Sequence, residues 1–248
     1  MSMGRTLNSR THLTPMRTLA LTLTLFSTMA LQAADLELKS LGDAAGGQIK
    51  RKYGPYVGVS AGESLGQTGK VKFGGQEFGL DSRSGAAIFS IDVGKSWKLK
   101  KVPLMLSLGA DGTFMSTSLE GKSTTGPAAS YQADMNTLFF NLNGTLAVDL
   151  YRYRARIGKF AAGFRPYIGG GLGGGQVWYR NATTTLATAS PFTIDEFINS
   201  WKWFAGVEWT WKDQYSVFAE YRDTHFGDLK DIKSYATDGY LVGFRYRY

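Results

Sequence analysis

The sequence predicts an all-β protein: an eight-stranded antiparallel transmembrane β-barrel that follows a cleaved N-terminal signal peptide. Three observations predict this fold class. An apolar run near the amino terminus has the form of an export signal, the remaining chain alternates apolar and polar residues with a period of two, and aromatic residues stand at both ends of predicted strands. Beyond the first 33 residues no stretch approaches the roughly 20 apolar residues that a spanning helix needs.

Residues 1–33 are predicted to be a signal peptide. The apolar run Leu19–Leu31 follows three arginines and precedes small residues, with a cleavage site after Ala33. A start at Met1 and a start at Met16 both fit this organisation, and a buried first helix is the alternative reading. Removing the segment takes three arginines and no acid from a formal net charge of +8.

The composition excludes several classes of site. The charges that remain are scattered along the chain, so we expect no nucleic-acid partner. The absence of cysteine removes disulfides, zinc–thiolate sites and cysteine nucleophiles. His225 is the only histidine after residue 33, which excludes histidine metal clusters. We therefore expect no cofactor and no metal.

The barrel is predicted to occupy residues 53–248, after a periplasmic lead-in at residues 34–52. The predicted strands are Gly54–Glu63, Gly85–Trp97, Val102–Ser116, Asn136–Tyr151, Phe164–Tyr179, Trp201–Lys212, Tyr215–Phe226 and Asp238–Tyr248. Their connections alternate between long, polar segments and short ones. Outer-membrane barrels show this asymmetry, with long external loops and short periplasmic turns.

The third and fourth strands show the alternation clearly. Apolar residues at Leu104, Leu106, Leu108 and Ala110 interleave with Ser107, Gly109, Asp111 and Thr113, and Leu138, Phe140, Leu142, Leu146 and Val148 interleave with Asn141, Asn143, Thr145 and Asp149. A soluble sheet would show the same alternation with its apolar face inward. Aromatic placement favours the membrane.

The sixth strand carries tryptophan at both ends. Ten residues at about 3.3 Å each, tilted by roughly 40°, span about 25 Å, which is the height of the apolar band between two aromatic girdles. The predicted girdle residues are Trp201, Trp203, Trp209, Trp211, Tyr240 and Tyr246.

The last strand ends in an aromatic pattern. Its residues Tyr240, Val242, Gly243, Phe244, Tyr246 and Tyr248 resemble the carboxyl-terminal signal that the barrel-assembly machinery recognises, with tyrosine in place of the usual final phenylalanine. The runs RPYIGGGLGGG (Arg165–Gly175) and FAEYRDTHFG (Phe218–Gly227) resemble strands of the small outer-membrane β-barrel family that includes OmpA-type and OmpX-type domains.

This resemblance extends from about Tyr53 to the end of the chain. It implies a place in the cell outer membrane, contact with outer-membrane lipid and lipopolysaccharide, and the barrel-assembly machinery and periplasmic chaperones as partners during biogenesis. It brings no catalytic residues and names no surface partner.

A glycine motif in the fifth strand has a structural explanation. Gly169, Gly171 and Gly174 match a dinucleotide-binding pattern, but that pattern needs a helix after it, and Val177 continues a strand. We interpret these glycines as relieving crowding inside a narrow barrel.

Charged residues on the inward parity form the main candidate site. They are Asp92, Asp111, Asp149, Lys202, Glu208, Glu220, Arg222, Arg245 and Arg247. Side chains fill an eight-stranded barrel, so charges there must pair to offset desolvation. A salt-bridge network is therefore predicted, and a gated or narrow ion path is the alternative.

The sequence favours a non-enzymatic barrel with a structural, membrane-integrity or surface-interaction role. A narrow channel for small or hydrophobic solutes is the alternative. A second alternative is a lipid A-modifying enzyme at the outer rim that uses His225, which is predicted to face outward.

Overall fold

A computed structural model describes residues 53–73, 75–82, 85–99, 102–185, 194–211, 214–228 and 232–248. The predicted signal peptide and lead-in lie outside the described residues. The described elements are β1 (Pro55–Phe73), β2 (Gln76–Ser82), β3 (Ala87–Lys98), β4 (Leu104–Ser123), β5 (Ser130–Val148), the 3-10 helix η2 (Leu150–Tyr153), α2 (Arg154–Ala161), β6 (Phe164–Thr184), β7 (Ile194–Trp211), β8 (Tyr215–Phe226) and β9 (Ile232–Arg247).

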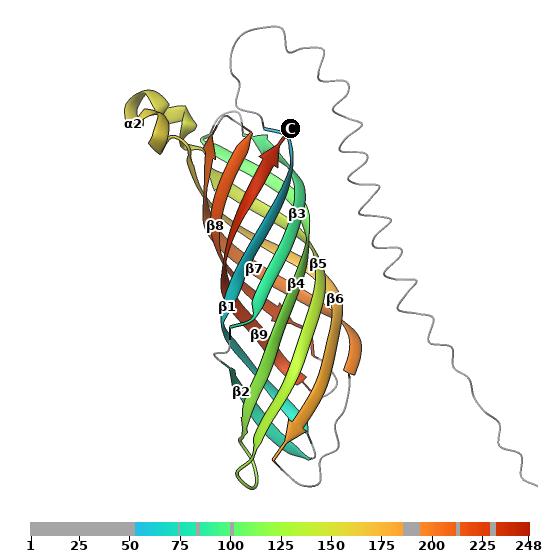
Figure 1. The fold of residues 1–248 in the computed structure, drawn as a ribbon. Coiled ribbons are helices and arrows are strands. Elements are labelled where there is room, and N and C mark those ends of the chain that lie inside the picture. The colour runs from blue at the N-terminus through green and yellow to red at the C-terminus, as the bar shows by residue number, and fades with distance from the viewer. Residues whose placement is uncertain are drawn as a thin grey trace, which may run out of the picture. The chain divides into compact units, whose positions relative to one another are not determined.

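Eight of these strands close into a ring, which confirms the predicted eight-stranded antiparallel barrel (Figure 1). Each strand from β3 to β9 pairs antiparallel with the next, β1 pairs with β3, and β9 closes the ring on β1. The closing pair runs from Tyr56↔Arg247 to Val71↔Ile232. Closure leaves no sheet edge within the ring, which is the condition for a sheet to cross lipid.

The strands extend further than the sequence predicts. Residues 64–84 were predicted as the first long loop, but β1 continues to Phe73 and β2 returns beside it as a hairpin. β2 also pairs with β4, from Phe78↔Ser123 to Leu80↔Gly121. The third connection, which is the second of the predicted long loops, shrinks in the same way, because β4 and β5 remain paired up to Lys122↔Ser130.

The fourth connection also differs from the prediction. β5 ends at Val148 rather than Tyr151, and η2 and α2 follow it. Asp149 therefore stands just beyond the strand, at the start of η2. The period of two ends here, and a run of basic residues interspersed with apolar ones takes a helical form. No helix among the described residues is long and apolar enough to cross a membrane.

The amphipathic pattern reverses along single strands. In the part of β4 that comes first in the sequence, the outward residues Leu108 and Phe114 are 53% and 42% exposed. Further along, the outward residue is the exposed Glu120, whereas the inward Leu119 is completely buried. One section of the barrel is thus apolar outside, and the next is apolar inside, as in a water-soluble protein.

The first section is the membrane-spanning one. Its outer wall exposes apolar residues on every strand of the ring: Val57, Val59, Phe89, Ile91, Leu106, Leu108, Phe114, Leu142, Leu146, Ile168, Leu172, Val207, Val217, Val242 and Phe244. A continuous apolar band around a closed barrel is the signature of an outer-membrane protein. The barrel therefore spans the outer membrane.

The second section we call the extracellular extension. Its interior is an apolar core that includes Phe78, Tyr131, Tyr179, Phe226 and Tyr235. Phe226 packs on Phe139 and Tyr235, with ring centroids 4.7 Å and 5.0 Å away. The opposite end of the barrel holds the short β3–β4 and β7–β8 connections and the end of β9. Because short connections lie on the periplasmic side of such barrels, we assign this end to the periplasm.

Candidate functional site in the barrel lumen

The predicted lumen charges lie inside the barrel. Asp92 projects from β3, Asp111 from β4, Lys202 and Glu208 from β7, Glu220 and Arg222 from β8, and Arg245 and Arg247 from β9. On each strand these residues occupy the alternate positions that face the lumen, between the residues that face lipid. Asp149 is also buried, although it follows β5. The structure divides these residues into two groups.

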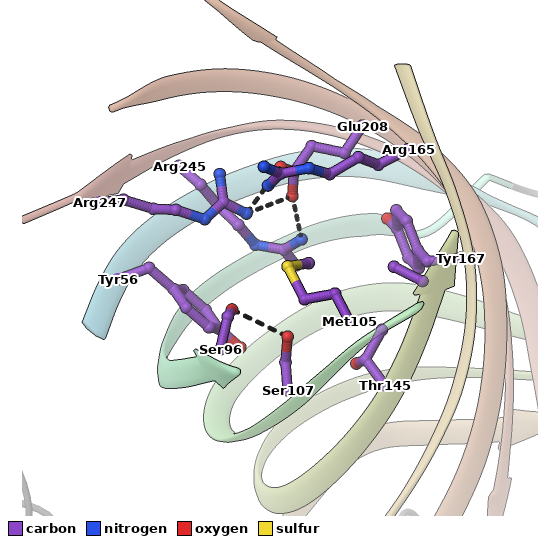
Figure 2. A pocket seen from close by; sticks show the side chains of 11 residues that line it. Tyr56, Ser96, Met105, Ser107, Thr145, Arg165, Tyr167, Glu208, Arg245 and Arg247 are labelled. Atoms are coloured by element: carbon purple, nitrogen blue, oxygen red, sulfur yellow. Dashed lines mark hydrogen bonds and ion pairs between the residues drawn. The ribbon is translucent and has the colours of Figure 1, made fainter. Parts of the chain in front are cut away.

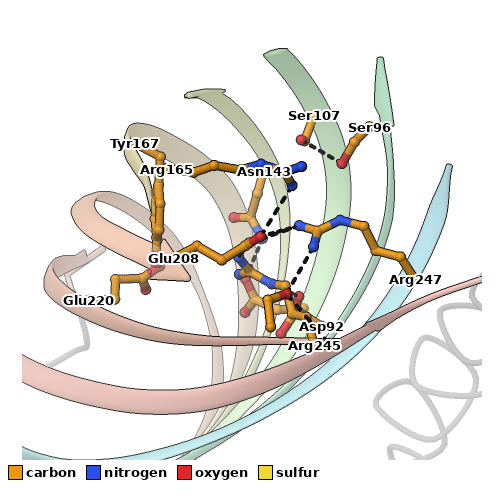
Figure 3. A network of polar contacts seen from close by, with 12 residues as sticks. Asp92, Ser96, Ser107, Asn143, Arg165, Tyr167, Glu208, Glu220, Arg245 and Arg247 are labelled. Atoms are coloured by element: carbon orange, nitrogen blue, oxygen red, sulfur yellow. Dashed lines mark hydrogen bonds and ion pairs between the residues drawn. The ribbon is translucent and has the colours of Figure 1, made fainter. Parts of the chain in front are cut away.

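The periplasmic cluster contains Asp92, Asp149, Arg165, Glu208, Arg245 and Arg247. Glu208 is its centre (Figure 3). The Glu208 carboxylate lies 2.6 Å from Nη2 of Arg247, 3.3 Å from Nη1 of Arg245 and 3.4 Å from Nη1 of Arg165. One buried carboxylate therefore holds three guanidinium groups from two different strands, β6 and β9.

The outer members of the periplasmic cluster complete its charge balance. Nε of Arg245 donates to Oδ2 of Asp92 at 2.8 Å, and Nε of Arg165 lies 3.7 Å from Oδ1 of Asp149. The hydroxyl of Tyr53 donates to the other oxygen of Asp149 at 2.5 Å. Three cations thus meet three anions, and the cluster carries no net charge.

The middle cluster contains Asp111, Lys202, Glu220 and Arg222. The ammonium group of Lys202 binds Asp111, which also accepts hydrogen bonds from Asn141 and Asn143. Arg222 binds Glu220 through Nη2 at 2.8 Å and Nε at 3.0 Å. Two cations meet two anions, so this cluster is also neutral.

Tyr167 stands between the two clusters. Its hydroxyl donates to Oε2 of Glu220 at 3.0 Å, and its ring centroid is 5.9 Å from the guanidinium carbon of Arg245. No ion pair joins the two clusters among the described residues. The charges therefore form two layers, whereas the sequence predicts one set.

Arg165 and Tyr167 were not among the predicted lumen residues. Both lie at inward-facing positions of β6, Arg165 four residues and Tyr167 two residues before Gly169. The outward Ile168 and Leu172 fix that parity, and counting from them would have placed Arg165 inside. The inward position of Tyr167 was harder to predict, because aromatic residues near strand ends more often face lipid in such barrels.

Glycines on β6 make room for the clusters. A Cβ on Gly171 would lie 2.1 Å from Oδ1 of Asn143, and one on Gly169 would lie 2.4 Å from the Phe204 ring. β6 therefore presents a flat inner wall, against which Lys202, Asn143 and Phe204 lie. A helix does not follow these glycines, since β6 continues to Thr184.

Side chains fill the bore. Figure 2 shows Glu208 and its three arginines among the residues that line a cavity of about 10 Å³, which is the volume a single water needs. Beyond the middle cluster, a second cavity of about 30 Å³ is lined by Ile88, Met115 and Phe139 among others. The apolar core of the extracellular extension continues from this cavity toward the extracellular end of the barrel. Among the described residues, no group of acidic, histidine or cysteine side chains could hold a metal ion.

The predicted girdle residues face outward at two levels. Trp201 and Trp203 on β7 lie near the extracellular boundary with Tyr240 of β9, and Trp209 and Trp211 lie near the periplasmic end with Tyr246. His225 also faces outward. Its ring stacks on Trp201 at 3.9 Å, and its Nε2 lies 3.2 Å from Asp223, which also accepts a hydrogen bond from Trp203.

The predicted assembly signal lies on β9. Tyr240, Val242 and Phe244 are exposed on the lipid-facing side, with Tyr246 on the same parity, and Gly243 faces Phe218 in the lumen. The backbone N–H of Tyr248 donates to the carbonyl of Pro55 at 3.2 Å, which ties the end of the chain to β1. Recognition by the assembly machinery stays a prediction.

No family model and no curated protein matches the sequence. The fold is similar to that of solved bacterial outer-membrane barrels. Neisserial surface protein A is 13% identical with a TM-score of 0.43, over 78% of this chain and 97% of that one. OprG from Pseudomonas aeruginosa is 14% identical with a TM-score of 0.41, over 81% and 98%. Ail from Yersinia pestis is 13% identical with a TM-score of 0.35, over 78% and 98%.

Proposed function

We propose that this chain is a closed, non-enzymatic outer-membrane barrel that contributes to membrane integrity and presents its extracellular extension for surface contacts. The filled bore carries this proposal. Glu208 and its three arginines occupy the periplasmic half, and the apolar core of the extension closes the other end. A solute would have to displace both.

The alternative of a narrow channel is less well supported. An ion path needs charges that water can reach, whereas the side chains of Asp111, Lys202 and Glu208 are at most 3% exposed. Both clusters are neutral, so no excess charge of either sign selects an ion.

The alternative of a rim enzyme depends on His225. That residue has an acidic neighbour in Asp223, but its stacking partner is Trp201, and no serine is among its contacts in the described part of the barrel. An aromatic anchor at the membrane boundary accounts for these contacts.

Planar-bilayer recording of the full-length protein tests the proposal. We expect no steady current from the wild-type barrel, because side chains fill its bore. A steady, ion-selective wild-type current would favour the channel. Lipid A mass spectra from cells with wild-type protein or His225→Ala test the enzyme, and a difference that depends on His225 would contradict the proposal.

A further inference from the structure

The β5–β6 connection carries a helical segment at the periplasmic end of the barrel. η2 and α2 occupy Leu150–Ala161, where a barrel of this type needs only a short turn. Figure 1 shows α2 standing to the side of the barrel rather than across its mouth. We infer that this segment is an interfacial anchor that binds anionic phospholipid in the periplasmic leaflet of the outer membrane.

Its apolar side chains are exposed. No residue of α2 is buried, and Tyr153, Ile157 and Phe160 are 39%, 42% and 69% exposed. Three large apolar side chains on so short a segment need an apolar partner. Because the segment adjoins the lipid-facing wall, the bilayer supplies one.

Phe160 fixes the depth of the segment. Its ring centroid lies 5.7 Å from Trp209 and 5.4 Å from Phe164. Trp209 in turn stacks on Trp211 at 5.5 Å, so Phe160 extends the periplasmic aromatic girdle sideways. Aromatic girdles mark the headgroup level of a bilayer. The segment therefore lies at the level where phospholipid headgroups meet the acyl chains.

Gly158 lets the segment take this shape. Its φ of 83° interrupts the helix, and a Cβ there would meet no other atom within 4 Å. The constraint is thus one of backbone conformation, which glycine adopts without strain. The break separates Arg154 and Arg156 from Phe160, which turns back onto Trp209.

The charge of the segment selects the lipid. Arg154, Arg156 and Lys159 are exposed, and residues 150–163 contain no acid. Each basic residue close to an anionic membrane surface favours binding by about fivefold. Apolar side chains between basic ones are the composition of helices that lie in a membrane interface.

A single fluorescent label tests the inference, because the chain has no cysteine. Ile157→Cys carries an environment-sensitive NBD group on full-length protein folded into phosphatidylcholine vesicles, with or without phosphatidylglycerol. Leu172→Cys, on the lipid-facing wall, and Gln132→Cys, on the outer wall of the extracellular extension, give the lipid and water references. Heat modifiability on a gel checks that each variant is folded.

With phosphatidylglycerol present, we expect emission from position 157 to shift to the blue of the Gln132 reference and to be quenched by headgroup-level lipid quenchers. Replacing Arg154, Arg156 and Lys159 together by Gln should move the emission back toward that reference. Emission equal to the water reference in both vesicle types would overturn the inference. A blue-shifted emission that changes neither with phosphatidylglycerol nor with the three substitutions would also overturn it.

Discussion

Tyr167 and Glu220, 53 residues apart in the sequence, meet inside the barrel through a hydrogen bond of 3.0 Å. Tyr167 belongs to β6 and Glu220 to β8, and β7 lies between them with Gly206. A Cβ on Gly206 would lie 2.6 Å from the Tyr167 hydroxyl, so the glycine is what lets the two side chains meet.

We predict that Tyr167→Phe lowers the free energy of unfolding by about 1.5–3 kcal/mol, because the charged acceptor Glu220 loses its donor. Urea unfolding in vesicles measures this. A double-mutant cycle with Glu220→Gln should show coupling between the two positions. Tyr153→Phe, at an exposed ring, is the control, and equal losses for both tyrosines would contradict the prediction.

Glu208→Gln should destabilise the barrel more strongly. Removing this charge leaves Arg165, Arg245 and Arg247 close together without their common anion, and breaking a buried ion pair costs about 3–5 kcal/mol. The matched change Glu120→Gln, on the exposed wall of β4, should have little effect. Similar urea midpoints for both variants would show that the periplasmic cluster is not stabilising.

The middle cluster should tolerate loss of both charges better than loss of one. Lys202→Met leaves Asp111 buried without its cation, whereas Lys202→Met combined with Asp111→Leu removes both desolvated charges. We expect the double variant to recover much of the stability that the single variant loses. Additive losses in urea unfolding would argue against this pairing.

The inner wall of β6 should reject side chains. Gly171→Ala places a Cβ 2.1 Å from Asn143 and should cost about 1–3 kcal/mol through overpacking. Gly144→Ala, on the lipid-facing side, puts its nearest atom at an ordinary 3.8 Å and should be tolerated. If both alanines are equally harmless, the space argument for the glycine stripe fails.

Assembly should depend on the end of β9. Tyr248→Asp, or deletion of residues 245–248, removes the final aromatic, and the deletion also removes the bonds to β1 near Pro55. We expect both variants to be absent from the outer-membrane fraction. Normal amounts of heat-modifiable protein in that fraction would contradict this prediction.

The sequence was sufficient for the ring because lipid and lumen impose opposite demands on alternate residues. In β9, Val242 and Phe244 face lipid and Arg245 and Arg247 face the lumen, as the period of two predicts. The ion-pair partners of the lumen charges could not be predicted. The alternation of residues shows which side chains face the lumen, but not how far along the barrel axis each one lies. Glu208 and Glu220 share a side, yet they belong to different clusters.

The extracellular extension was not recognised for a related reason. The predicted strand ends near Ser116, because the alternate positions that face lipid are no longer apolar beyond that residue. The strand in fact continues with inverted parity, so Leu119 turns inward and Glu120 outward. A search for a change of parity, rather than for its loss, would have found it. The helix α2 was missed because its residues do not alternate between apolar and polar as strand residues do.

The reversal of parity along β4 has a consequence for the surrounding bilayer. Sinking the barrel by two residues of β4 would carry Ser116 into hydrocarbon and bring Glu120 closer to it, and raising it would expose Phe114 to water on the extracellular side. Two residues correspond to only about 5 Å of height for a strand tilted by roughly 40°. The barrel therefore cannot absorb a change in membrane thickness by sliding, and a thicker or thinner bilayer must stretch or compress around it.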